Sequence, residues 1–387
     1  MSLSTTGLTD VEIGALLSDA SVGATVTVNA AAMTDADLTS LSTNIAKVDA
    51  ITGLTVTNAQ SSTEIGNLLS KASGATVTAT AMDATDLGQV AANIGGVGSI
   101  TNLTLDSTMG ADLISELLGT KTAAASVDVD ATGMSAAQLN AIGAEIAEID
   151  AITGTLALTS GVNASAMSSI YAEYTGTTST VVATGMSAAQ LNAIDDTKVA
   201  ANGITGTFTI NADVTLAQIT ALLAKTAAGA TLTVDATGMS AAQISAVEVG
   251  IAVVDTLTGL TLTSSQSAAE MTDLLGSAAV ASNSVSVDAT GMDDEELAAV
   301  ATGIAKVAAD GVVGSVSISE TANLTEALID ALLAKVSEAA SVTVNATGFS
   351  TDALEDVSDD IANVDTITNL TVTSTEEVAE IGNLLSK

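Results

Sequence analysis

The sequence predicts a tandem-repeat α/β solenoid of about seven units, each built from two β–α coils. Three observations lead to this prediction: a strand pattern recurs about every 52 residues, a helical apolar stripe follows each strand, and the strands are apolar on alternate positions only. A solenoid grows by stacking repeats, so we expect residues 1–387 to form one repeat array, where the length alone would suggest two or three domains.

The repeat is clearest in its first strand, which begins at Ile51 with the segment Ile-Thr-Gly-Leu-Thr-Val-Thr. Related segments begin near residues 100, 152, 204, 257, 312 and 367, and partial units stand at both ends. Because the chain starts and stops within a repeat, we expect it to be a slice of a longer array. Within each strand, apolar residues such as Leu54 and Val56 alternate with Thr or Ser, which is typical of a half-buried strand.

Two helical patterns complete each unit. The first places apolar residues at i, i+3 and i+4 from Ile65, and the second places them at i, i+3, i+7 and i+10 from Leu139. The second helix is often preceded by a capping box, in which a Ser hydroxyl accepts a backbone N–H while a Gln side chain reaches back. The three predicted boxes pair Ser135 with Gln138, Ser187 with Gln190, and Ser240 with Gln243.

The alternation also decides between two kinds of α/β fold. A doubly wound sheet is covered by helices on both faces, and its strands are therefore apolar on both faces. Here every second strand position is Thr or Ser, so we expect one parallel β-sheet with helices on one side and a hydroxyl-rich face open to water on the other.

The segments Leu257-x-x-Leu260-x-Leu262 and Ile51-x-x-Leu54-x-Val56-x-Asn58 resemble the first part of a leucine-rich repeat. The resemblance covers the first half of most units and implies a parallel sheet on one side, helices on the other and binding through the open face. This chain departs from the family pattern because its second strand lacks the leading apolar residue, no Asn ladder recurs, and alternating Thr replaces variable residues.

Composition excludes several functions. The chain has no His, Cys or Arg, which removes the commonest general base, thiol nucleophile and bidentate phosphate clamp. We therefore predict that it is not an enzyme. A net charge of −37 disfavours nucleic acid as a partner, and no run of 18 apolar residues predicts a membrane span. The charge itself is typical of a solvated surface.

The alternating threonines form the predicted binding face. Their simplest interpretation is β-propensity, since Thr suits a solvent-facing strand position. The alternative is a repetitive recognition surface; the rows resemble those of ice-binding proteins, although Asp128, Ser286 and Ser315 interrupt them. The candidate residues are Thr25, Thr27, Thr55, Thr57, Thr76, Thr78, Thr207, Thr209, Thr231, Thr233, Thr261, Thr263, Thr371 and Thr373.

Four aspartates, Asp49, Asp150, Asp255 and Asp365, close the second helix immediately before the next strand. One interpretation is hydrogen bonding to nearby backbone N–H groups in a turn. The alternative is calcium, which takes six to eight oxygen ligands and could be the one cofactor of this chain. These residues are weak calcium candidates because no recognised calcium-binding loop is present, and no other metal or cofactor site is predicted.

The acidic composition, rich in Ala, Thr and Gly, resembles that of bacterial surface-layer proteins and giant repeat adhesins. This predicts a structural or adhesive module of a large secreted bacterial protein, at the cell surface or outside the cell. Its partners would be other repeats of the same protein or cell-surface components. The alternative is a binding module that recognises a carbohydrate, a protein or ice through the Thr-rich face.

Overall fold

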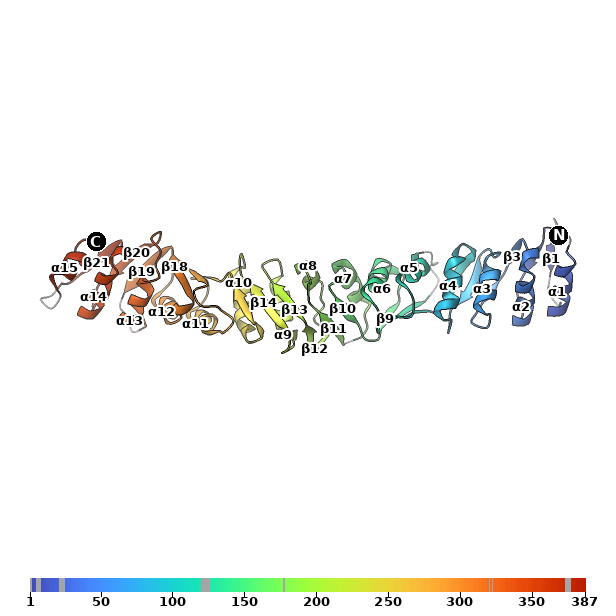
Figure 1. Cartoon of the computed structure of the whole chain (residues 1–387), viewed down its shortest axis with the longest axis horizontal. Helices are drawn as coiled ribbons and strands as arrows, with labels where there is room; N and C mark the ends of the chain where they lie inside the picture. Colours follow the sequence, from blue (N-terminus) through green and yellow to red (C-terminus); the bar gives the residue numbers. More distant parts are fainter. Residues whose placement is uncertain are drawn as a thin grey trace. The chain divides into compact units, whose positions relative to one another are not determined.

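The computed structural model of the chain describes residues 2–4, 8–20, 25–119, 126–176, 178–319, 321, 323–372 and 377–387. Its contacts divide the chain into two units. The first unit holds Met1–Val182 with Ala193–Gly203, and the second holds Ala183–Asn192 with Ile204–Lys387. Each unit consists of stacked β–α repeats (Figure 1). The prediction of a single array over residues 1–387 stays a prediction.

Short α-helices alternate with the strands throughout both units. Several begin at a Ser, Thr, Asp or Asn N-cap whose side chain accepts a backbone N–H, and all three capping boxes predicted from the sequence are confirmed. The helices are α1 (Asp10–Ser18), α2 (Asp35–Thr43), α3 (Ser62–Leu69), α4 (Ala84–Ala92), α5 (Ala111–Gly119), α6 (Ala136–Ala144), α7 (Ala164–Glu173), α8 (Ala188–Asn192), α9 (Leu216–Lys225), α10 (Ala241–Val249), α11 (Ala268–Gly276), α12 (Asp294–Thr302), α13 (Glu326–Leu333), α14 (Thr351–Asp359) and α15 (Val378–Leu384). No helix of the described residues is long and apolar enough to span a membrane.

The second helix of most repeats continues into one 3-10 turn, which ends just before the next strand. These turns are η1 (Ile45–Lys47), η2 (Ile94–Gly96), η3 (Ile146–Glu148), η4 (Ile251–Val253), η5 (Ile304–Lys306) and η6 (Ile361–Asn363). Each is followed by an extended Val or Ile that leads the chain back into the sheet.

The strands of the described residues form three-stranded parallel sheets in consecutive order. In the first unit these are β1 (Ser2–Ser4), β2 (Thr27–Asn29) and β3 (Ala50–Thr52); β4 (Thr55–Val56), β5 (Ala75–Thr78) and β6 (Val97–Thr101); and β7 (Leu103–Leu105), β8 (Val127–Asp130) and β9 (Ala151–Thr153). β10 (Ala157–Thr159) pairs with β11 (Ser179–Val182), and β12 (Val199–Thr205) crosses the division between the units. In the second unit these are β13 (Thr207–Ile210), β14 (Thr231–Asp235) and β15 (Thr256–Thr258); β16 (Thr261–Thr263), β17 (Val285–Asp288) and β18 (Val307–Val313); and β19 (Ser315–Ser319), β20 (Ser341–Asn345) and β21 (Thr366–Thr368).

The first strand of each repeat is interrupted rather than continuous, which the alternation alone does not predict. Residues 51–57, for example, split into β3 and β4 at Gly53, whose φ is 64°. A left-handed residue stands at the same place in every repeat, because the strand leaves one neighbour there and joins the next. These residues are Gly53, Asn102, Gly154, Gly206, Gly259, Gly314 and Asn369.

Burial confirms a one-sided core. In β13, Phe208 and Ile210 are buried while Thr207 and Thr209 are exposed, and Ile219 on α9 is fully buried on the covered side. Figure 1 shows β13 beside β14, with which it pairs residue for residue. The helices therefore cover one face of the strands, and each unit is an α/β repeat solenoid.

Candidate interaction surfaces

The predicted threonines of the described residues lie on the face that the helices leave uncovered. Seven are exposed, namely Thr25, Thr55, Thr207, Thr209, Thr231, Thr261 and Thr371. Six are half-buried, namely Thr27, Thr57, Thr76, Thr78, Thr233 and Thr263. Thr373 lies outside the described residues. None of the thirteen is buried, so their alternation with core residues follows the pleat of the strands.

Strand register joins these residues into rows across the sheets. Thr209 stands beside Thr233, and Thr233 stands beside Thr256 on the next strand. We use the name open hydroxyl face for the outward residues of the second unit, namely Thr207, Thr209, Thr231, Thr233, Thr256, Thr261, Ser286, Ser315, Ser317, Ser341, Thr343 and Thr366. Neighbouring strands of a sheet lie about 4.8 Å apart, so the rows present regularly spaced donors and acceptors.

Two of the candidate threonines have a local structural role. The Thr57 hydroxyl lies 3.4 Å from Gln60 Oε1, and the Thr263 hydroxyl lies 3.2 Å from Gln266 Oε1. Both glutamines are buried and also accept the backbone N–H of the same threonine. These two positions close the turn that leads from the strand into the first helix.

The four aspartates predicted at the helix ends form a repeated backbone clamp. In each case Oδ2 accepts the N–H of a residue 23 positions earlier, in or directly before the second strand, at 2.7 Å for Val26, Val127 and Leu232 and 2.8 Å for Val342. The aspartate's own N–H donates to the carbonyl oxygen of that same residue, at 2.9–3.0 Å. The aspartates do bond backbone N–H groups, but the predicted local turn is wrong, because the bonded residue lies 23 positions earlier in the preceding coil. The bonded pairs are Asp49 with Val26, Asp150 with Val127, Asp255 with Leu232, and Asp365 with Val342.

Calcium binding by these aspartates stays a prediction. One carboxylate oxygen of each is already occupied by the backbone, and no group of three or more acidic side chains suited to a metal occurs among the described residues. If calcium bound, the temperature of unfolding would rise with added calcium and fall with a chelator.

A further row of polar residues, which the sequence reasoning missed, ends the second strand. Asp130 Oδ1 accepts the N–H of Thr132, and the Thr132 hydroxyl oxygen accepts the N–H of Thr155 in the next coil. Hydrogen bonding from the Thr132 side chain, and then from its backbone, lowers the pKa of Asp130 below its usual value. The recurring Asp-Ala-Thr-Gly segment was the signal for this link, because Asp and Thr two residues apart favour such a turn.

Several lysines of the described residues are engaged by the backbone. The ammonium groups of Lys47, Lys198, Lys306 and Lys335 donate to carbonyl oxygens, including Ala20 at 3.3 Å and Ser277 at 3.2 Å. These contacts supply donors to carbonyls near helix ends and in the following loops. The open hydroxyl face consequently gains no positive charge from them.

The sequence matches no protein-family model and no curated protein sequence. Among solved structures, the chain is similar to the crystal structure of the leucine-rich repeat-containing protein LegL7 from Legionella pneumophila. Identity is 14%, the match covers 100% of this chain and 98% of that one, and the TM-score is 0.19. The fold assignment accordingly rests on the strand register and burial described above.

Proposed function

We propose that the chain is a non-catalytic interaction module that binds a partner protein through the open hydroxyl face. The observation that carries the proposal is that a sheet face built from repeated Thr and Ser is left uncovered by its own helices. Hydroxyl groups both donate and accept hydrogen bonds, so such a face can satisfy the mixed polar groups of a protein surface.

The composition of this face favours a protein as the ligand over a carbohydrate or ice. Sugars are commonly held against aromatic rings, but of the four aromatic side chains Phe208, Tyr171 and Tyr174 are buried and Phe349 is half-buried. Ice binding requires uninterrupted rows, whereas the outward positions of the second unit also include the exposed Val313. This interruption suits a less regular partner.

The wider role in this proposal is structural or adhesive, as part of a larger secreted protein at a bacterial cell surface. Composition supports it, because the chain is strongly acidic and contains neither Cys nor Arg. The absence of His and Cys supports a non-catalytic role, since these side chains supply most general bases and thiol nucleophiles.

The test uses protein and glycan arrays probed with the whole chain and with two variants. Replacing Thr209, Thr233 and Thr256 by Val removes one row of hydroxyls and retains β-branched side chains. The control replaces Thr220 and Thr302 by Val on the helix side. We expect binding to array proteins that weakens about tenfold in the first variant only, because buried polar groups of the partner lose their hydrogen bonds. Binding that the row variant leaves intact would contradict the proposal.

A further inference from the structure

The junction between the second helix of one repeat and the first helix of the next has a recurring contact. Ser42 at the end of α2 accepts a hydrogen bond from Asn67 of α3, at 3.1 Å between Nδ2 and Oγ. The same contact recurs between Ser358 of α14 and Asn383 of α15, at 3.0 Å. Other junctions place a small residue at the serine position, such as Ala91 or Ala301, both buried. A small, neutral residue therefore lets the two helices approach closely.

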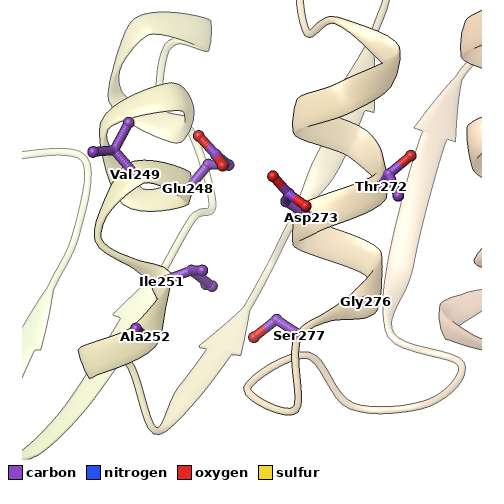
Figure 2. A pocket seen from close by; sticks show the side chains of 8 residues that line it. All are labelled: Glu248, Val249, Ile251, Ala252, Thr272, Asp273, Gly276 and Ser277. Atoms are coloured by element: carbon purple, nitrogen blue, oxygen red, sulfur yellow. The ribbon is translucent and has the colours of Figure 1, made fainter.

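At the junction of α10 and α11, the two equivalent positions hold Glu248 and Asp273. Figure 2 shows their carboxylates directed toward one another across the gap between the helices. Partial burial raises the pKa of Glu248 above its usual value, and the nearby Asp273 raises it further. Two like charges thus face each other where the α2–α3 and α14–α15 junctions form a neutral hydrogen bond.

The helices separate at this point. Among junctions between a full-length second helix and the next first helix, α10 and α11 are the least closely packed in the described part of the chain. A groove of about 610 Å³ lies between them, lined by Glu248, Val249, Ile251, Ala252, Thr272, Asp273, Gly276 and Ser277. Ile251 points into this groove toward Ser277 (Figure 2).

An exposed apolar residue lies at the rim of the groove. Val249 ends α10, projects away from α11 and is 82% exposed. The equivalent positions in other repeats carry only small or polar residues, namely Thr43, Ala92, Ala144, Thr302 and Asp359. This junction therefore combines two acids and an exposed valine that the fold does not require at these positions.

We infer that the α10–α11 groove binds a basic segment of a partner protein. A lysine or arginine of the partner lies between Glu248 and Asp273. One aliphatic side chain of the partner packs against Ile251 inside the groove, and a second packs against Val249 on the outer side of α10. Charge complementarity selects this occupant, because a cation replaces the repulsion of the two carboxylates by attraction. The apolar contacts distinguish such a segment from a small cation, which could neutralise the acids without covering Val249. This surface is separate from the open hydroxyl face.

The test measures binding of a synthetic helical peptide with Lys and Leu at helical spacing, and of the same peptide with each Lys replaced by Gln. The key variant, E248S/D273N, installs the Ser–Asn pair of the α2–α3 and α14–α15 junctions and should fold at least as stably as the wild type. The matched control, E338Q/D310N, removes two exposed acids elsewhere in the second unit. A third variant, V249T, installs the residue that stands at the equivalent positions 43 and 302.

We expect the lysine peptide to bind E248S/D273N about tenfold more weakly than the wild type or E338Q/D310N, and V249T a few-fold more weakly. Equal weakening by the two double variants would overturn the inference, because binding would then follow the net charge. Equal binding of the lysine and glutamine peptides would overturn it as well. The Val substitutions on the open hydroxyl face should leave peptide binding unchanged, so the two proposals fail independently.

Discussion

Two kinds of repeat differ in the group that pairs with the first backbone N–H of the second strand. Where the chain runs Val-Asp after the second helix, as at Val254 and Asp255, the carboxylate accepts the N–H of Leu232 on the preceding strand. Where it runs Val-Ala-Ala-Asp-Gly, as in residues 307–311, the backbone forms a bulge instead. Val307 then pairs with Val285, and pairing resumes at Val312 beside Val287.

Two of the repeats without this aspartate contain a left-handed residue that the Asp-ended repeats lack. Asp310 has a φ of 54°, and Asn202, at the same place in an earlier repeat, has a φ of 57°. Asn and Asp tolerate this conformation better than other non-glycine residues. The comparison indicates that the fold requires a partner for the first N–H of the strand and accepts either a side chain or extra backbone to supply it.

The largest difference between the two kinds of repeat should follow removal of the aspartate. Asp255→Ala leaves the buried N–H of Leu232 without its acceptor, so we expect a loss of about 1–3 kcal/mol in the free energy of unfolding. Asp310→Ala should cost less, about 1 kcal/mol, because it only places Ala in a left-handed conformation. Urea unfolding of both variants measures the difference, and equal losses would remove the distinction between clamp and bulge.

A second, smaller change in the free energy of unfolding should be the same in both kinds of repeat. The turn before the second helix is left-handed, and Ala32 and Ala81 occupy a position that is glycine in the later repeats. Ala32 belongs to an Asp-ended repeat, and Ala81 belongs to a repeat without the aspartate. We expect Ala32→Gly and Ala81→Gly each to stabilise the fold by about 0.5–1 kcal/mol. The reverse change, Gly133→Ala, should destabilise it. A gain confined to one of the two repeats would show that their turns differ.

The smallest expected effect concerns pH at the last Asp-ended repeat. Burial, followed by repulsion from Asp330 and Glu326, raises the pKa of Asp356 to about 6. Its pKa in the folded state lies above the unfolded value, so the native state binds the proton more tightly and stability rises as pH falls through 6. We expect the melting temperature to increase from pH 7.5 to pH 5, and the increase to shrink in Asp356→Asn. If the melting temperature of that variant depended on pH as it does in the wild type, the increase would come from other acidic residues.

Sequence reasoning predicted the local features well because they depend on near neighbours. Alternation in a strand such as β13, and the capping box of Ser240 with Gln243, are each contained within a few residues. The split of the first strand at Gly53 depends on which neighbouring strand each half joins. The position of Glu248 opposite Asp273 depends on how α10 packs against α11. The apolar periodicity of a single helix does not predict that contact.

The central claim is that helices cover one face of the strands and leave the hydroxyl face in water. The chain contains no cysteine, so each introduced thiol is a unique probe. We would place cysteine in turn at Thr207, Phe208, Thr209 and Ile210 of β13 and measure its reaction with a maleimide under native conditions. The two threonine positions should react at the rate of an exposed thiol, and the two core positions on the order of 100-fold more slowly. Protection at Thr209 equal to that at Ile210 would mean that both faces are covered, and would contradict the claim.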